Sequence, residues 1–369
     1  MMRSIEQVLA DYDADAPLER AFTIPGSWYT DPRVAEVEAR TVFTRSWQLV
    51  GRADQLLAPG CYVTAEIAGE PIVVVRGQDG VLRAFFNVCR HHAAAVMTEC
   101  AGKADRLRCP YHGWTYGLDG ALRGVTELEG LEGFEREGMG LVPVRVAAWE
   151  QLVFVCLDPT APSLEDWLGA RLRAEVSALG VGALRFAGRR EWTLACNWKV
   201  FVDNYLDGGY HVPFLHRGLN SVLSFKEYTI DCFDRVCLQA SPVESGAGND
   251  AMTASVRKGR AAYYWLYPNL MLNCYEGYLD TNLVLPLGHD RVKVVFDFYF
   301  DDVESEAARA RNERSIEVSA RIQDEDHAIC ESVQRGLGSR AYRAGRLSVR
   351  REAGEHLFHR LLAADLRTR

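Results

Sequence analysis

The sequence lacks the features of several large classes of protein. Its apolar runs, such as residues 151–157, are far shorter than the ~20 residues that cross a bilayer, so no membrane span is expected. It has no basic excess, because 50 acidic residues outnumber 42 basic ones, and this argues against a nucleic-acid-binding surface. No apolar segment follows the N-terminal methionines, so no signal peptide is expected and a cytoplasmic location is predicted.

Cofactor-binding turns, repeats and linkers are missing as well. No Gly-x-Gly-x-x-Gly turn joins a predicted strand to a helix, so the chain is not expected to bind NAD(P)H itself. There is no internal repeat, low-complexity stretch or long linker. The ten cysteines, in a cytoplasmic chain, are expected to be reduced thiols or metal ligands rather than disulfides.

The pattern of the 369 residues predicts three segments. Residues 1–45 are expected to form two helices, and residues 46–160 show short strands separated by glycine-rich turns, typical of an antiparallel β domain. Residues 161–369 mix helices with further strands. Helices are predicted over 5–12, 31–43, 161–179 and 303–336, and strands over 61–67, 71–76, 82–88, 152–157 and 291–300 and within 260–285. We therefore predict an α+β protein in which the β domain is inserted into a larger domain built from both chain ends.

Two Cys–His pairs stand at short spacing in the predicted β domain. Cys89 precedes His91 by two residues, and Cys109 precedes His112 by three. Two Cys and two His can hold a zinc ion or a Rieske [2Fe–2S] cluster. A Cys-x-His pair is tight for one ion but suits a two-iron cluster, in which each loop sends its Cys to one iron and its His to the other. A zinc ribbon and four unrelated residues are the alternatives, and His92 is expected to be a neighbour rather than a ligand.

A second pair of histidines lies in the third segment. His211 and His216 are five residues apart, which on a straight helix would separate them by roughly 140°. Pro213 makes a straight helix improbable, so a bent segment could turn both side chains toward one ion. Two histidines alone are weak evidence for a metal site, and a structural role is the alternative.

The helix predicted over 321–337 offers a third ligand. Its apolar stripe is expected to consist of Ile322, Ile329, Val333 and Leu337. Asp326 falls within this stripe, whereas Asp324 lies on the polar face and Glu325 at the stripe's edge. A buried carboxylate is costly unless it is paired or bound to metal, and an ion pair with a core Arg is the alternative. Together with two histidines, it would form the two-His, one-carboxylate site of oxygen-activating iron enzymes.

Several segments resemble a known family. Residues 86–92 (Phe-Asn-Val-Cys-Arg-His-His) and 109–116 (Cys-Pro-Tyr-His-Gly-Trp-Thr-Tyr) resemble the Rieske motif of ring-hydroxylating oxygenase α subunits. The family usually has Arg and Gly where this chain has His92 and Ala93. Residues 197–211, with the later Gln-Asp-Glu-Asp segment, resemble the catalytic domain of Rieske oxygenases. The sequence Leu-Asp-Gly-Gly-Tyr-His within it most resembles the choline monooxygenase-like branch.

The resemblance implies a fold and a set of cofactors. The fold would be an all-β Rieske domain inserted into a helix-grip (START-like) catalytic domain, and the assembly a homotrimer. The [2Fe–2S] cluster would be held by Cys89, His91, Cys109 and His112. A mononuclear Fe(II), with O₂ as co-substrate, would be held by His211, His216 and Asp326. Electrons from NAD(P)H would arrive through a separate flavin or ferredoxin-type reductase.

The resemblance also assigns roles to two polar residues. In the family, an acidic residue just before the first iron histidine connects to a cluster histidine of the neighbouring subunit. Asp207 is the candidate, facing His112 of another chain. It stands four residues before His211 rather than the usual three, with Gly208 at the usual place, so the extra residue could form a bulge. Asn204 is expected to lie close to the iron.

The expected reaction is hydroxylation or N-dealkylation of a small organic molecule. Aromatic residues gather in one region: Tyr263, Tyr264, Trp265, Tyr267, Tyr275 and Tyr278. Their faces could surround a quaternary ammonium ion such as choline, a betaine or carnitine. Packing within a sheet is the alternative for each ring. Hydroxylation of aromatic rings is the alternative function, and a Rieske electron carrier without oxygenase activity is a more remote one.

Overall fold

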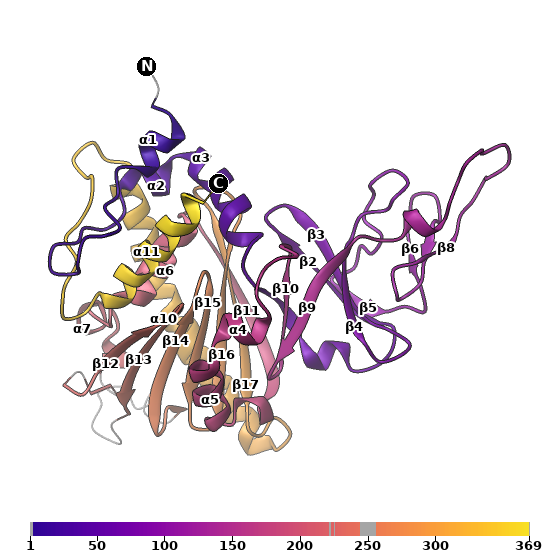
Figure 1. Ribbon diagram of the computed structural model, residues 1–369. Helices are drawn as coiled ribbons and strands as arrows, with labels where there is room; N and C mark the ends of the chain where they lie inside the picture. The colour runs from indigo at the N-terminus through magenta and orange to yellow at the C-terminus, as the bar shows by residue number, and fades with distance from the viewer. Residues whose placement is uncertain (1–2, 221–222, 225, 244–255, 369) are drawn as a thin grey trace. The chain divides into compact units, whose positions relative to one another are not determined.

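The computed structural model describes residues 3–220, 223–224, 226–243 and 256–368 (Figure 1). The chain divides into two compact units, one made of Met1–Glu38 and Leu168–Arg369, the other of Ala39–Trp167. The mixed architecture expected from the sequence is confirmed, because an all-β unit interrupts a unit that contains both helices and a sheet. Within the described ranges, none of the helices combines the length and apolar character that crossing a membrane requires.

The all-β unit contains two antiparallel sheets. The larger has the order β1-β10-β9-β4-β3-β2-β5, and the smaller the order β6-β7-β8. The strands of the larger sheet are β1 (Gln48–Arg52), β2 (Cys61–Ile67), β3 (Glu70–Arg76), β4 (Leu82–Phe86), β5 (Ala101–Lys103), β9 (Pro143–Trp149) and β10 (Leu152–Cys156). Those of the smaller sheet are β6 (Leu107–Arg108), β7 (Thr115–Tyr116) and β8 (Leu122–Gly124). Short helical turns are η1 (Ala39–Phe43), η2 (Ala53–Leu56) and η3 (Glu137–Met139).

One apolar core joins the two sheets of this unit. Val73 and Phe85 from the larger sheet pack in the same cluster as Leu107 and Tyr116 from the smaller one. The loops that follow β4 and β6 begin at this core, so residues early in each loop are buried while the loop tips reach solvent.

The larger unit is built on a seven-stranded antiparallel sheet of order β11-β17-β16-β15-β14-β13-β12. Its strands are β11 (Arg185–Leu194), β12 (Thr229–Phe233), β13 (Val236–Pro242), β14 (Arg260–Leu266), β15 (Leu270–Tyr275), β16 (Tyr278–Pro286) and β17 (Val292–Phe300). The helices of the chain are α1 (Ile5–Leu9), α2 (Gly26–Thr30), α3 (Pro32–Glu38), α4 (Leu164–Leu168), α5 (Ala170–Ala178), η4 (Val181–Ala183), α6 (Trp198–Leu206), α7 (Val212–Leu215), α8 (Arg217–Asn220), α10 (Glu306–Leu337) and α11 (Ala353–Leu366).

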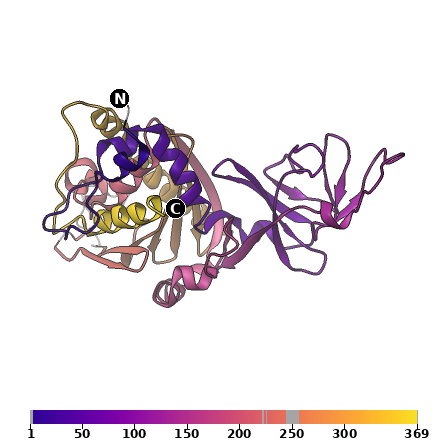
Figure 2. The ribbon, with the colours of Figure 1, turned by 45° about the horizontal axis from the view of Figure 1, so that its top comes forward.

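Three helices cover one face of this sheet, as a helix-grip fold requires (Figure 2). The long α10 packs against β11 and α6, while α11 packs against β12 and α6. Helix α6 contacts β16, farther into the sheet, and it also contacts both of the other helices. Residues on α6 and α10 therefore meet over the sheet although they are more than a hundred positions apart in the sequence.

The start of α6 is fixed by a buried network. Asn197 caps the helix, and its side chain accepts a hydrogen bond from the Lys199 amide at 3.0 Å. The Lys199 ammonium, which is fully buried, forms an ion pair with Glu38 at 2.6 Å. The second oxygen of Glu38 accepts from the Trp198 indole at 2.8 Å. These contacts connect α6 to α3, and they therefore fix the position of the residues farther along α6 relative to the sheet.

The helix predicted over 161–179 is two helices. It breaks at Gly169, whose φ of 77° is left-handed and cannot continue an α-helix. The chain turns there from α4 into α5. The glycine was the visible signal for this break, and the helical periodicity on either side concealed it.

Candidate metal centres and the adjoining cavity

The loops that begin at Cys89 and Cys109 have the same hydrogen-bond frame. In each loop the Cys amide donates to the carbonyl five residues later, at 2.8 and 2.9 Å, and the amide four residues later donates back to the Cys carbonyl, at 3.0 and 3.1 Å. The fourth residue after each Cys is left-handed: Ala93 has a φ of 60° and Gly113 a φ of 73°. Each loop therefore folds back sharply, and the histidine between these two points is carried on the outside of the turn.

The two loops bring their Cys and His side chains together. Cys89 and Cys109 are both buried, and the rings of His91 and His112 approach with their centroids 4.7 Å apart. His91 lies flat on Trp114, at a centroid distance of 4.7 Å and an interplanar angle of 6°. Two buried sulfurs below two adjacent imidazoles are the donor set of a Rieske cluster, and all four predicted residues are present in this arrangement.

The surroundings of these residues supply a hydrogen-bond donor to one of the two sulfurs. The Tyr116 hydroxyl lies 3.4 Å from the Cys89 sulfur and accepts from the Arg90 amide at 3.0 Å, so its own proton is directed to the sulfur. Burial raises the pKa of Tyr116, which keeps this proton in place. His92, expected to be a neighbour, is exposed, and its ring centroid lies 4.0 Å from that of His91.

A second group of ligands forms in the larger unit. His211 and His216 flank the short helix α7, which contains Pro213, and Asp326 projects toward them from α10. Oδ1 of Asp326 lies 3.0 Å from Nε2 of His216 and 3.9 Å from Nε2 of His211. These three donor atoms lie within 4.8 Å of one another, with His216 buried and the others half-buried. The three residues predicted from the sequence thus converge, and two nitrogens and one carboxylate oxygen suit a non-haem iron.

Each histidine of this group is held by a carboxylate on its other nitrogen. Nδ1 of His211 is 2.6 Å from Asp207, and Nδ1 of His216 is 2.6 Å from Glu325. A proton on Nδ1, donated to the carboxylate, leaves the Nε2 lone pair free for a metal. Asn204 donates from Nδ2 to Oδ1 of Asp326 at 2.9 Å, which orients the third ligand. The donor set and its supports therefore fit one mononuclear metal.

Two glycines let Asp207 reach back to His211. Asp207 ends α6, and the next residues, Gly208 and Gly209, are left-handed with φ of 68° and 69°. A Cβ on Gly208 would stand 2.1 Å from the Arg351 carbonyl oxygen, so only glycine fits there. The reversal brings the carboxylate onto both the amide of His211, at 3.0 Å, and its ring. The extra residue expected from the sequence is thus taken up in this turn.

The predicted surroundings of Asp326 were partly wrong. Ile329 and Val333 are 39% and 44% exposed, so they do not belong to a buried stripe. The buried stripe of α10 instead passes through small and polar residues, among them Ser315, Ser319, Gln323 and Cys330. Asp326 lies on this stripe and faces inward because the helix borders a cavity of mixed aromatic and polar lining rather than an apolar core.

Neighbouring acids on α10 have roles that the sequence did not reveal. Glu325, expected at the edge of the stripe, holds His216. Asp324, expected on the polar face, accepts from the Trp192 indole at 3.1 Å. The two acids differ in role because Asp324 meets Trp192 on β11, whereas Glu325 meets His216 at the end of α7. The local sequence pattern does not show which neighbour each acid meets.

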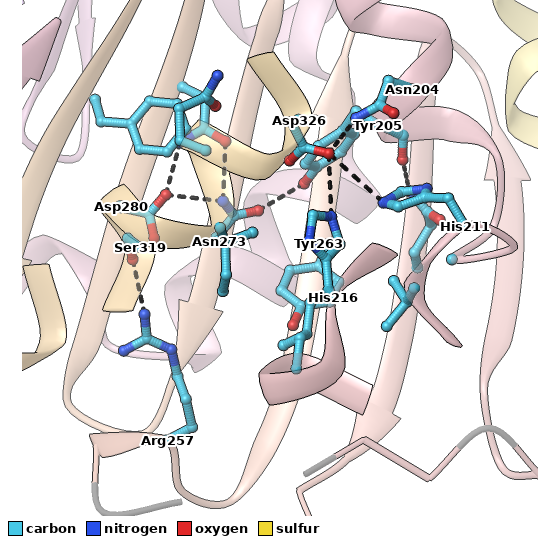
Figure 3. A pocket seen from close by; sticks show the side chains of 18 of the residues that line it. Asn204, Tyr205, His211, His216, Arg257, Tyr263, Asn273, Asp280, Ser319 and Asp326 are labelled. Atoms are coloured by element: carbon cyan, nitrogen blue, oxygen red, sulfur yellow. Dashed lines mark hydrogen bonds and ion pairs between the residues drawn. The ribbon is translucent and has the colours of Figure 1, made fainter. Parts of the chain in front are cut away.

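A cavity, partly open to solvent, adjoins the His211–His216–Asp326 group (Figure 3). Its aromatic lining consists of Phe201, Tyr205, Tyr228, Tyr263, Tyr275 and Phe296. Of the six aromatic residues singled out in the sequence, only Tyr263 and Tyr275 line it. The others do not line it; the Tyr264 hydroxyl, for example, donates to Glu175 at 3.2 Å. Tyr205 and Tyr228 were missed because they stand outside the aromatic run.

Two buried charges line the same cavity, Asp280 and Arg257. Asp280 accepts from the Tyr278 hydroxyl at 2.6 Å, from Asn273 at 2.8 Å and from Asn282 at 2.7 Å. Burial raises the pKa of Asp280, and these three donors oppose that effect by stabilising the carboxylate.

Comparison with known proteins identifies two domains in the chain. Residues 46–135 match the Rieske [2Fe-2S] domain, and residues 181–367 match the ring hydroxylating alpha subunit catalytic domain. The chain belongs to the Rieske non-haem iron oxygenase family. It is an oxidoreductase whose cofactors are a [2Fe–2S] cluster and a mononuclear non-haem iron, with O₂ as co-substrate.

Relatives of this oxygenase cover nearly its whole length. A chloroplastic choline monooxygenase of Arabidopsis thaliana is 42% identical over 98% of this chain and 87% of its own. The oxygenase subunit of carnitine monooxygenase from Escherichia coli (strain K12) is 34% identical over 94% of each. A solved quaternary ammonium Rieske monooxygenase with a bound inhibitor superposes with a TM-score of 0.85 at 30% identity, over 99% of each chain. Naphthalene 1,2-dioxygenase from a Rhodococcus species shares the fold, with a TM-score of 0.76 at 21% identity.

Proposed function

We propose that this oxygenase hydroxylates a quaternary ammonium compound. The observation that carries the proposal is the cavity beside His211, His216 and Asp326, which combines aromatic faces with the buried carboxylate of Asp280. A quaternary ammonium ion has no N–H to donate, so it is recognised by ring faces and negative charge. The relatives named for choline and carnitine support the same substrate class.

We propose ligands for each cofactor. The cluster is held by Cys89, His91, Cys109 and His112, and the iron by His211, His216 and Asp326. When bound, the cluster stores electrons and the iron activates O₂. The overall change is a C–H bond, O₂, two electrons and two protons giving C–OH and water. Hydroxylation of a carbon bonded to nitrogen releases a dealkylated amine and an aldehyde, whereas hydroxylation elsewhere gives a stable alcohol.

The supporting residues favour one tautomer of the two histidines and hold the iron ligands in one orientation. Asp207 and Glu325 each hold a proton on the Nδ1 of one histidine, so that both Nε2 atoms stay available. Asn204 fixes one oxygen of Asp326 through its amide. The aromatic lining keeps most water away from the reacting carbon, and this limits side reactions with solvent.

We propose that electrons come from a separate flavin or ferredoxin-type reductase, and that the enzyme is a homotrimer. In that assembly Asp207 would face His112 of a neighbouring subunit. The exposed position of the His91–His92 loop tip and the partial exposure of Asp207 support this. A solved relative is described as using inter-subunit electron transfer. The domain division 1–45, 46–160 and 161–369 and the cytoplasmic location stay predictions.

Single turnover tests the proposed function. The purified, iron-loaded protein is reduced chemically and mixed with O₂ and a panel of quaternary ammonium and aromatic compounds, and products are read by mass spectrometry. An oxygenated or N-dealkylated ammonium product is expected. Turnover of aromatic compounds alone would overturn the proposal and would indicate that the cavity binds planar aromatic rings.

A further inference from the structure

The cavity contains a buried cation that is not needed to bind an ammonium ion. Arg257 lines the cavity and is only 4% exposed. Its Nη1 donates to the Ser315 hydroxyl at 2.5 Å, and its Nη2 donates to the Ser319 hydroxyl at 2.7 Å and to the Ser315 carbonyl at 3.5 Å. All these acceptors are neutral, and Arg257 takes part in none of the ion pairs found among the described residues. A buried cation without a direct ion pair is costly, which points to an anion supplied by a ligand.

The guanidinium is held in a fixed plane. It lies over the rings of Tyr275 and Tyr278, with its central carbon 4.9 and 4.5 Å from their centroids. None of the three hydrogen bonds to serine uses Nε. A flat, oriented guanidinium is the group that best matches a carboxylate, because its parallel N–H bonds can engage both oxygens.

Arg257 and Asp280 are linked without touching. The Ser319 hydroxyl that bonds Arg257 lies 3.0 Å from the Tyr278 hydroxyl, which donates to Asp280 at 2.6 Å. In Figure 3 both charged residues lie on one side of the cavity, with His211, His216 and Asp326 on the other. The carboxylate of Asp280 already accepts three hydrogen bonds, so it acts on Arg257 through its charge and not through a direct ion pair. Neighbouring charges of opposite sign complement a molecule that carries both signs.

We propose that Arg257 binds the carboxylate of a zwitterionic substrate, so that the enzyme acts on trimethylammonium carboxylates rather than on choline. The inference rests on the proposed function and narrows it. Choline carries only a positive charge, and in this cavity it would leave Arg257 without an anion. A betaine places its carboxylate on Arg257 and its ammonium group among the tyrosines and Asp280.

The test compares acids with their amides. Trimethylammonium carboxylates of increasing chain length, including glycine betaine and γ-butyrobetaine, are assayed beside their primary amides, which have the same shape but no negative charge, and beside choline. The wild type is expected to favour the best acid over its amide by about 100-fold in kcat/KM, the size of effect typical of a lost charge-assisted pair. Arg257→Met should lose about 100-fold on the acid and change less than about 3-fold on the amide. The matched control is Arg260→Met, an exposed arginine at the start of β14, which should behave as wild type.

The outcomes separate the two proposals. A wild type that prefers choline or the amides overturns the inference while the proposed function stands, and this comparison needs no variant. If Arg257→Met lost equal kcat/KM on the acid and on the amide, Arg257 would have a structural role instead. A conservative variant, Arg257→Lys, that failed to fold would lead to the same conclusion. If no trimethylammonium compound is turned over by the wild type, the proposed function itself fails.

Discussion

The two metal-binding regions of this protein are built in opposite ways. The Cys89–His91 and Cys109–His112 loops each place a sulfur and an imidazole within a few residues, on one repeated backbone frame. The His211–His216–Asp326 group joins a bent segment after α6 to a helix more than a hundred positions later. In the first region the backbone of the loops sets the ligand positions, whereas in the second the side chains of other residues do so.

This difference affects how each region tolerates change. The cluster loops depend on two sharp reversals and on a shared apolar core. The iron ligands depend on two carboxylates, those of Asp207 and Glu325, which bond the Nδ1 atoms of the histidines. They depend also on the polar stripe of α10, which carries Asp326. Damage to one region should therefore leave the other intact, and each variant below tests that independence.

Asp326→Ala should have the largest effect on the second region alone. It removes the only carboxylate among the three converging ligands, so we expect turnover to be abolished and the mononuclear iron to be lost. The visible spectrum of the cluster should be unchanged, because no part of its frame involves α10. Iron content, visible absorption and single turnover measure this together. Activity at the wild-type level would refute the assignment of Asp326 as a ligand.

His112→Ala should have the converse effect. The imidazole that pairs with His91 is removed, so the cluster and its red-brown colour should be lost while mononuclear iron binding persists. The measurement is the visible spectrum, with the iron content of the second site determined in the same preparation. Tyr111→Ala, which alters an exposed neighbouring ring without removing a ligand, is the control and should keep its colour. An unchanged spectrum in His112→Ala would exclude the ligand role.

These two variants also mark what the sequence could predict. The cluster ligands were predictable because all four stand in short motifs. His211 and His216 were found because Pro213 implied a bend between them. Asp326 was predicted from an apolar stripe that two exposed residues, Ile329 and Val333, contradict. The helix lies against a cavity of mixed aromatic and polar lining, and the sequence of a single helix does not show which neighbour it faces.

The rest of the second site depends on contacts between distant elements. Arg257 has no distinguishing local pattern, and its position is set by Ser315 and Ser319 on another element. Tyr205 on α6 and Tyr228 before β12 have no distinguishing local pattern either, and only the folded chain brings both to the cavity. The strand periodicity predicted which elements exist, but it could not predict which side chains meet across the sheet.

Glu325→Gln should give a smaller, graded loss. The amide keeps the shape of the side chain but loses the charge that holds His216 by its Nδ1, so iron affinity or turnover should fall about 10- to 100-fold. Asp324→Asn is the matched control on the same helix, because that residue bonds Trp192 instead of a ligand. The measurement is iron affinity by competition with a chelator, together with kcat. Equal effects of the two substitutions would mean that Glu325 acts only through helix stability.

The smallest expected effects come from exchanging the fourth residues of the two cluster loops. Ala93 adopts the same left-handed conformation as Gly113, and that conformation costs a residue with a Cβ about 1–2 kcal/mol. Ala93→Gly relieves this cost but increases the freedom of the unfolded chain, so a net stabilisation of about 0.5–1 kcal/mol is expected. Gly113→Ala should destabilise by a similar amount, since the atoms nearest a new Cβ, at 3.3 Å, belong to the flexible Arg108 side chain. Thermal unfolding of the cluster-loaded protein, followed at the cluster absorption band, measures both. If the two substitutions shifted stability in the same direction, the loops would differ in more than this one residue, and the shared hydrogen-bond frame would not be what determines their stability.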